Sequence, residues 1–321
     1  MKHRPRLAGL ALLSVSCFAL QVVDGFLNLN KARAMTSHDC VGAVRCLLTT
    51  KKVGHGGTLD PMAEGVLPIA VGRATRLLPY LPSDKAYEAV ICFGLTTTTD
   101  DLEGNILTRQ PAPSLTLDAI KAALPQFLGQ ITQVPPVFSA IQVQGQRLYD
   151  LARRGEAVTP PSRQVEVHHL EVRDWQPGDY PELTLSIDCG PGTYIRSIAR
   201  DLGQILSTGA TLAHLTRTRS GGFDLAQSLT LEQVKALVET HTLALEPPES
   251  ALGYLPSVAL EPDLARRWQQ GQKLPPPCNL LPDTPYRVLH AITDDFLGIG
   301  QLESRAEGPI LKARMVFQPQ P

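Results

Sequence analysis

One segment of the chain combines residue types from which a catalytic loop can be built. Residues 54–68 read GHGGTLDPMAEGVLP, so one carboxylate, Asp60, follows a glycine-rich stretch that contains His55. A carboxylate held in a pocket can act as a nucleophile or as a general base. The two common glycine-rich phosphate-binding patterns are absent from this stretch. Asp–Pro pairs are also frequent in turns, so the local pattern alone favours an Asp60 that simply caps a following helix.

Positive charge is concentrated in two parts of the sequence. Residues 45–85 hold six Lys and Arg against three Asp and Glu, and residues 191–222 hold four against one. The whole chain has 30 Lys and Arg and 31 Asp and Glu, which excludes a general basic surface for nucleic acid. The two local excesses are what an anion-binding face requires, although a chance clustering of solvated charges would give the same counts.

The cysteines and histidines do not form a metal-binding pattern. Six cysteines stand at positions 17, 40, 46, 92, 189 and 278, without a C-x-x-C pair and without zinc-ligand spacing to any of the eight histidines. We therefore expect reduced thiols in a cytoplasmic protein. The sequence also has no nicotinamide or flavin motif, and we expect no metal and no cofactor.

The elements that must position these residues form a mixed pattern. A length of 321 residues predicts about two domains. Strands and helices do not alternate in β-α-β order, which favours an α+β fold. The expected strands are 25–29, 87–95 and 183–189, with a turn at 190–192 and a polar loop at 96–104. The expected helices are capped by Ser37 and Thr116, run through Ile195–Ile205, and begin at a capping box of Thr230 with Gln233.

The two ends of the chain differ from its middle. Lys2, Arg4 and Arg6 precede an apolar run at 7–20 that is similar to a signal peptide, but no clean cleavage site follows it, and the run is short for a membrane span. We expect residues 1–23 to be an extension that is disordered or not native. Proline-rich breaks at 247–263 suggest a domain boundary, and from position 286 the tail becomes strand-like.

The segment around Asp60 closely resembles the signature of the TruB family of bacterial tRNA pseudouridine-55 synthases, roughly H-x-G-T-L-D-P-x-A-x-G-V-L-P. Further matches follow in the family's order from about 25 to 240. They are M-T-S-H-D at 35–39, K-x-Y at 85–87, Q-V-P-P-V-F-S-A at 133–140, G-Q-R-L-Y at 145–149 and G-T-Y-I-R at 192–196. Four departures stand out: N-K-A-R-A at 30–34 in place of D-K-P-x-G, Gly56 in place of threonine, Glu64 in place of a small residue, and Thr216 in place of arginine.

The resemblance implies a fold and a division into domains. It implies an α+β pseudouridine synthase fold, with a central mixed, largely antiparallel sheet flanked by helices and a small C-terminal PUA-like β subdomain. We expect the catalytic domain at 24–246, with an RNA-gripping insertion at 133–160. A linker and the PUA-like subdomain would follow at 247–321, where the segments 296–300 and 311–317 look like closing strands.

The resemblance also implies the chemistry. Asp60 would attack or deprotonate the target nucleotide, so that the glycosidic bond breaks and the uracil rejoins the ribose through C5. Whether it acts at C6, C1′ or C2′ stays open. An ionised carboxylate in a closed pocket needs a cationic partner, and Arg196 is the one implied. The implied substrate-binding residues are His55, Tyr87, Tyr194, Arg196 and Leu215.

The implied partner is the T-stem-loop of tRNA, bound by a monomer in the cytoplasm without a membrane. Its uridine 55 would be flipped out of the loop. The candidate contacts to the RNA backbone are Lys51, Lys52, Arg147, Arg153, Arg154, Arg217 and Arg219. Two alternatives stay open: a protein that binds or folds RNA on the same scaffold without turnover, and, from the apolar run at 7–20, an exported protein.

Overall fold

The computed structural model describes residues 24–139, 142–143, 146–147, 154, 160–306 and 308–317. Among these residues, nine strands form one central sheet in the order β1-β3-β12-β4-β11-β10-β7, with β2 paired to β3 and β13 to β12. The pairing is antiparallel except between β3 and β12, so the sheet is mixed and largely antiparallel. Its strands are β1 (Gly25–Lys31), β2 (Val53–His55), β3 (Glu64–Val71), β4 (Lys85–Phe93), β7 (Gly129–Gln133), β10 (Arg163–Gln176), β11 (Glu182–Cys189), β12 (Ala210–Ser220) and β13 (Phe223–Asp224).

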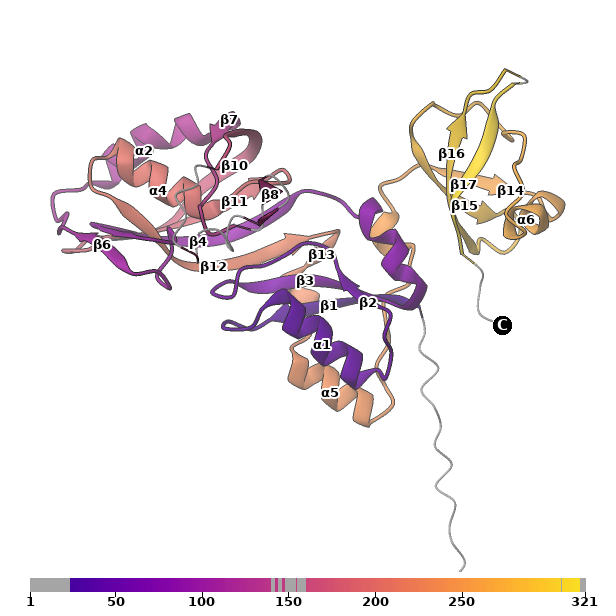
Figure 1. Cartoon of the computed structure of the whole chain (residues 1–321), viewed down its shortest axis with the longest axis horizontal. Coiled ribbons are helices and arrows are strands. Elements are labelled where there is room, and N and C mark those ends of the chain that lie inside the picture. The colour runs from indigo at the N-terminus through magenta and orange to yellow at the C-terminus, as the bar shows by residue number, and fades with distance from the viewer. Residues whose placement is uncertain are drawn as a thin grey trace, which may run out of the picture.

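Helices cover the two halves of this sheet (Figure 1). The helix α4 packs on β12 and β4, whereas α1 and α5 pack on each other beside β1 and β2. The helices are α1 (Ser37–Leu47), α2 (Leu117–Ala123), α4 (Ile195–Ile205) and α5 (Leu231–Glu239). Short 3₁₀ turns lie at Gly72–Tyr80, Leu124–Phe127, Leu225–Gln227 and Ser250–Leu252. Two hairpins complete the described part of this unit, β5 (Leu95–Thr97) with β6 (Ile106–Arg109) and β8 (Gln142–Val143) with β9 (Gln146–Arg147).

The sequence patterns explain most of these elements. In β11 every second side chain is buried, which is the period of a strand with one face in the core. The capping box of Thr230 with Gln233 and the Thr116 cap are confirmed. The predicted Ser37 cap is wrong, because Thr36 caps α1 through a capping box with Asp39. The predicted loop at 96–104 is also partly wrong, since it begins with the strand β5.

A second, smaller sheet follows the central one along the chain. The strands β14 (Ser257–Leu260), β15 (Pro285–His290), β16 (Phe296–Glu303) and β17 (Ile310–Val316) are joined in that order, with α6 (Pro262–Gln269) against them. The predicted strands near 286, 296–300 and 311–317 are confirmed, whereas 257–260, predicted as part of the boundary, is a strand of the small sheet. Its core is centred on the fully buried Trp268.

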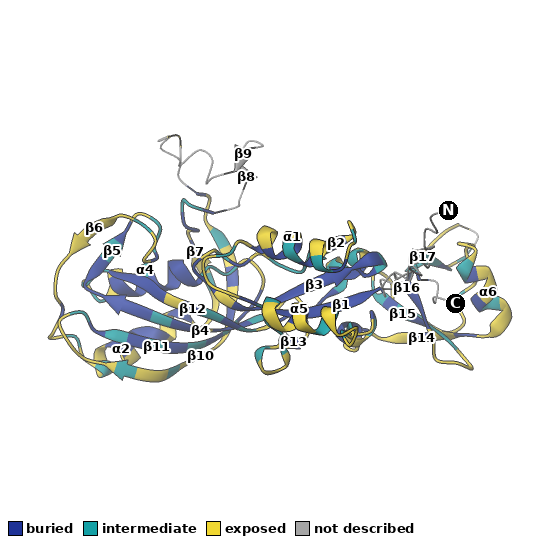
Figure 2. Ribbon diagram, turned by 90° about the horizontal axis from the view of Figure 1, so that it is seen from below, coloured by how far each residue is buried: buried dark blue, intermediate teal, exposed yellow. Residues whose placement is uncertain are grey.

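The small sheet is attached to the central unit through a shared apolar cluster. Phe26 and Leu77 of the central unit belong to the same buried cluster as Phe296 and Phe317. The Arg73 guanidinium lies 4.8 Å from the centre of the Phe317 ring. Figure 2 shows buried ribbon running through both units. These buried aromatic contacts join the two units.

Candidate active site

Asp60 lies on the loop between β2 and β3, and two side chains, Arg217 and Ser37, fix that loop. The guanidinium of Arg217 donates hydrogen bonds to the carbonyl oxygens of Gly57 (3.0 Å), Thr58 (3.1 Å) and Val66 (2.8 Å). The Ser37 hydroxyl accepts from the Leu59 N–H at 2.8 Å. No helix follows Asp60, because β3 begins at position 64, so the alternative of a helix cap is wrong.

Arg196 holds the Asp60 carboxylate. Its Nη2 lies 2.8 Å from Asp60 Oδ2, and its side chain is 5% exposed against 35% for Asp60. Arg196 is the second residue of α4, and the start of this helix is fixed by Gln133. The Gln133 side chain donates to the Tyr194 carbonyl at 3.0 Å and accepts from the Tyr194 N–H at 2.8 Å. The buried guanidinium thus holds the more exposed carboxylate at a position that a substrate can reach.

Arg196 has further partners that the sequence did not predict. Its Nη1 donates to the Thr99 carbonyl at 3.0 Å and lies 3.5 Å from Asp101 Oδ2, and its Nη2 donates to the Phe138 carbonyl at 3.1 Å. The Asp101 side chain is 5% exposed. Arg196 therefore bridges two carboxylates, one facing the core and one facing the cavity. The sequence signal for Asp101 was only the acidic end of the loop at 96–104.

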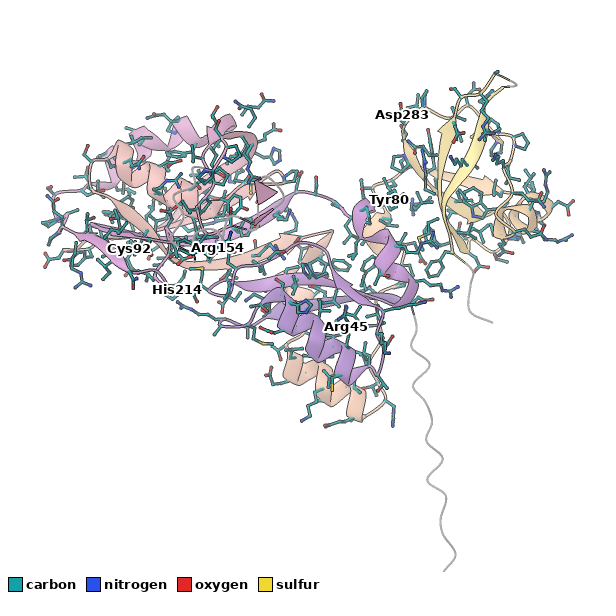
Figure 3. The ribbon with its side chains drawn as sticks, viewed as in Figure 1. Arg45, Tyr80, Cys92, Arg154, His214 and Asp283 are labelled. Atoms are coloured by element: carbon teal, nitrogen blue, oxygen red, sulfur yellow. The ribbon has the colours of Figure 1, made fainter. Side chains whose placement is uncertain are left out.

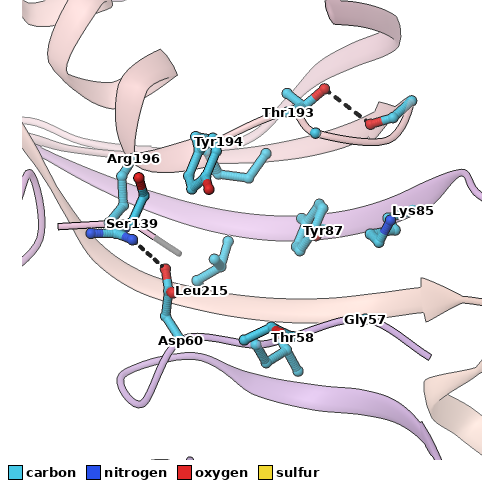
Figure 4. A pocket seen from close by; sticks show the side chains of 14 residues that line it. Gly57, Thr58, Asp60, Lys85, Tyr87, Ser139, Thr193, Tyr194, Arg196 and Leu215 are labelled. Atoms are coloured by element: carbon cyan, nitrogen blue, oxygen red, sulfur yellow. Dashed lines mark hydrogen bonds and ion pairs between the residues drawn. The ribbon is translucent and has the colours of Figure 1, made fainter. Parts of the chain in front are cut away.

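A cavity of about 250 Å³ opens in front of this pair (Figure 4). Tyr87 and Leu215 are mostly buried in its wall, on the paired strands β4 and β12. Burial raises the pKa of Tyr87 to about 12, so the phenol stays neutral. Tyr194 also lines the cavity, and the Arg163 guanidinium lies 5.0 Å from the centre of its ring. A nucleobase can stack on such aromatic faces.

The structure brings five predicted residues to this cavity: Asp60, Tyr87, Tyr194, Arg196 and Leu215. His55 is not among the lining residues. It lies half-buried at the end of β2, and burial lowers the pKa of its imidazole, which keeps the ring neutral. Lys85, Ser139 and Thr193 also line the cavity and were not predicted to do so, although Lys85 belongs to the K-x-Y match and Thr193 to G-T-Y-I-R.

The candidates for RNA backbone contacts fall into three groups. Lys51, Lys52 and Arg154 are exposed (Figure 3 labels Arg154), and Arg219 is 46% exposed and pairs with Asp188 at 3.2 Å. Arg153 lies outside the described residues, as does the side chain of Arg147. Arg217 is 0% exposed, so its prediction as a phosphate contact is wrong. Its guanidinium is used to hold the Asp60 loop.

Two negative findings apply to the described part of the chain. Within it, no group of three or more His, Cys, Asp and Glu side chains is placed to hold a metal ion. Nor does any helix there have the length and apolar character needed to cross a membrane.

Comparison with known proteins places this geometry in context. The family model described as TruB family pseudouridylate synthase (N terminal domain) matches residues 45–195. The tRNA pseudouridylate synthase B C-terminal domain matches 196–254, and the C-terminal model of pseudouridine synthase II TruB matches 256–310. A protein of Nostoc sp. named tRNA pseudouridine synthase B is 54% identical over 92% of this chain and 99% of its own length. One of Acaryochloris marina with the same name is 58% identical over 87% of this chain and 94% of its own.

Solved structures share the fold. A crystal structure of a Cbf5-Nop10-Gar1 complex matches with a TM-score of 0.70 and 25% identity, over 94% of this chain and 86% of that one. An H/ACA RNP bound to a substrate RNA containing 2′-deoxyuridine matches with a TM-score of 0.69 and 24% identity, over 92% and 85%.

Proposed function

The chain belongs to the TruB family of pseudouridine synthases, and we propose that Asp60 carries out, on uridine 55 of tRNA, the isomerisation for which its curated relatives are named. The chain is thus a tRNA pseudouridine synthase, an isomerase that acts without redox change. The single observation that carries the assignment of Asp60 is its 2.8 Å pair with the buried Arg196 at the edge of the cavity.

The geometry supports a sequence of events. The target uridine leaves the loop of the RNA at a cost of a few kcal/mol and enters the cavity, whose volume suits one extruded nucleoside. Its uracil stacks against Tyr87, which returns roughly 1–3 kcal/mol, while Tyr194 and Leu215 close the sides. Asp60, held by its ion pair with Arg196, acts on the nucleoside as nucleophile or base. The glycosidic N1–C1′ bond breaks, the uracil turns, and a C5–C1′ bond forms as C5 loses its proton and N1 takes one up.

The proposal extends to the RNA and the cell. The substrate is the T-stem-loop of tRNA, bound by a monomer in the cytoplasm through exposed cations such as Lys51, Lys52 and Arg219. His55 lies next to the Asp60 loop, and we assign it to the space in the RNA that the flipped base leaves. The catalytic domain extends over 24–246 with the RNA-gripping insertion at 133–160. The small sheet in 247–321 is a PUA-like unit that adds RNA contacts.

Tritium release tests the assignment. The wild-type protein is incubated with tRNA transcript labelled with tritium at uridine C5, and pseudouridine formation releases that tritium to water. Asp60→Asn should bind the transcript and release none. Asp118→Asn, which changes an exposed carboxylate on α2, should match the wild type. Full release by Asp60→Asn would contradict the role of Asp60, and binding without release by the wild type would favour an RNA-folding protein.

A further inference from the structure

Lys85 differs from the arginines Arg196 and Arg217 in how its charge is neutralised. Arg196 is paired with two carboxylates and donates to two carbonyl oxygens. Arg217 is buried and donates to three carbonyl oxygens. The Lys85 ammonium donates one hydrogen bond, to the Ser83 carbonyl at 2.9 Å, and has no ion-pair partner within the described residues. A half-buried ammonium without a counterion is a site that favours an anionic ligand.

Lys85 and Asp60 lie at opposite sides of the cavity. In Figure 4, Lys85 and Thr193 occupy one side of the view and the Asp60–Arg196 pair the other, with Tyr87 and Leu215 between them. A nucleoside stacked on Tyr87 with its ribose at Asp60 can therefore reach Lys85 with another part of the nucleotide.

Three glycines lie close to Lys85 around the cavity. Lys85 pairs in register with Cys189, the last residue of β11, which continues directly into the turn that carries Gly190 and Gly192. Both glycines line the cavity, as does Gly57, where an added Cβ would lie 3.6 Å from Lys85 Cε. Glycines at these three positions allow a ligand to approach the backbone closely.

We propose that Lys85 and the glycine turn at 190–192 bind the phosphodiester next to the flipped uridine, and that this contact positions the ribose against Asp60. The inference rests on the proposed function, because it needs an RNA nucleotide in the cavity. A phosphodiester is the anionic group that every such nucleotide carries beside its ribose, and an ammonium binds it as a point charge.

The contact is tested by neutralising each partner in turn. Two T-stem-loop RNAs carry one methylphosphonate, 5′ or 3′ of the target uridine, and are compared with the all-phosphate RNA. Lys85→Met should lower kcat/KM on the all-phosphate RNA by roughly ten- to a hundredfold, the range of a hydrogen bond to a charged group. One of the two methylphosphonates should lower the wild-type value by a similar factor, and should lower that of Lys85→Met no further.

Several outcomes would overturn the inference. If neither methylphosphonate affects the wild type, Lys85 contacts no adjacent phosphate, and this result needs no variant to fold. If the loss from Lys85→Met and the loss from a methylphosphonate multiply at both the 5′ and the 3′ position, the contact is contradicted as well. That result would favour Lys85 as a proton carrier. Lys85→Arg, which keeps the charge, should retain most activity, and Lys121→Met, an exposed lysine of α2, should behave as the wild type.

The same comparison separates the inference from the proposed function. Wild-type protein that releases no tritium from the all-phosphate RNA contradicts the proposed function alone. Dissociation constants measured in the Asp60→Asn background then still report the contact, because they require binding and no turnover. In that background the methylphosphonate and Lys85→Met should again give non-additive losses, and additive losses would contradict the phosphate contact.

Discussion

Arg196 and Asp60 are joined at 2.8 Å, but the two side chains have different surroundings: the guanidinium is 5% exposed and the carboxylate 35%. The arginine is fixed by Asp101 and by two carbonyl oxygens on its protein side. The carboxylate keeps its other oxygen for the cavity. Arg196 is therefore held rigidly by the protein, and Asp60 is the reactive group of the pair. Substitutions of Arg196 and of its other partners can test this arrangement without changing Asp60.

The first prediction concerns the fork of the arginine. Arg196→Lys keeps the charge but loses the planar set of donors that reaches Asp60, Thr99 and Asp101 at once. Turnover in the tritium assay should fall by about 10²–10³, while the dissociation constant for RNA changes by about threefold or less. Arg173→Lys, on the exposed face of β10, should change neither. If Arg196→Lys binds RNA more weakly but keeps its turnover, the role of the Arg196–Asp60 pair in catalysis is contradicted.

Asp101 acts through Arg196 and never reaches the cavity. Its Oδ1 accepts hydrogen bonds from the Thr99 hydroxyl and the Glu103 N–H, so the side chain is held in place. Asp101→Asn should lower kcat about tenfold with little change in KM, because only the position of the guanidinium changes. In a double-mutant cycle with Arg196→Lys, the loss of kcat in the double variant should be smaller than the product of the two single losses. Fully independent losses would mean that Asp101 is merely structural.

Arg217 and Arg219 lie two residues apart on β12. Substitution of Arg217 should mainly lower stability, whereas substitution of Arg219 should mainly affect RNA binding. Arg217→Met removes the donor to the buried Val66 carbonyl and to the Gly57 and Thr58 carbonyls at the cavity, so the free energy of unfolding should fall by about 3 kcal/mol in a denaturant titration. Arg219→Met should cost stability about 0.5 kcal/mol or less. It should instead reduce the salt dependence of RNA binding by about one unit of slope. The reverse pattern would restore Arg217 as a phosphate contact.

This pair also shows what the sequence could and could not predict. Leu215 and Arg217 share a face by the two-residue period of a strand, so the position of Arg217 in the core was open to prediction. The prediction instead placed Arg217 in solvent, because its side chain is positively charged. A register shift between Arg217 and Arg219 then turns Arg219 outward, and nothing in the local sequence indicates such a bulge.

Local signals predicted the elements well, and non-local contacts limited the prediction of the site. The Thr230 and Thr116 caps follow from residues within one helical turn. At α1, two hydroxyls stand side by side, and tertiary structure decides between them, because Ser37 binds the backbone of Leu59 instead of capping. Asp101 meets Arg196 only because the loop between β5 and β6 contacts α4, a contact that no spacing rule contains.

Ala34 is strained at a position where the family pattern has glycine. Its φ is +67°, in the left-handed region, and its N–H donates to the Pro61 carbonyl beside Asp60. Ala34→Gly should raise the free energy of unfolding by about 1 kcal/mol, since glycine adopts this conformation without a Cβ clash. Ala119→Gly, at an exposed position in the first turn of α2, should lower it by a similar amount. Loss of stability in both variants would contradict the strain.

The last prediction concerns pH and RNA affinity. Burial, and then the charge of Arg217, lower the pKa of Lys85 from its ordinary 10.5, while Asp84 acts in the opposite sense. Cys189, its neighbour on β11, has a pKa raised to about 11 by burial and stays a neutral thiol. An amine is charged below its pKa and neutral above it, so a lowered pKa moves the loss of charge to a less alkaline pH.

RNA affinity in the Asp60→Asn background should therefore decline on the alkaline side before an ordinary lysine loses its proton. Dissociation constants measured with one T-stem-loop RNA across the alkaline range give this profile. Lys85→Arg should move the decline to higher pH, because a guanidinium keeps its charge throughout. Lys85→Met should bind the RNA more weakly at neutral pH and should not show this decline in affinity on the alkaline side. Identical profiles for all three proteins would mean that the ammonium of Lys85 does not contact the RNA.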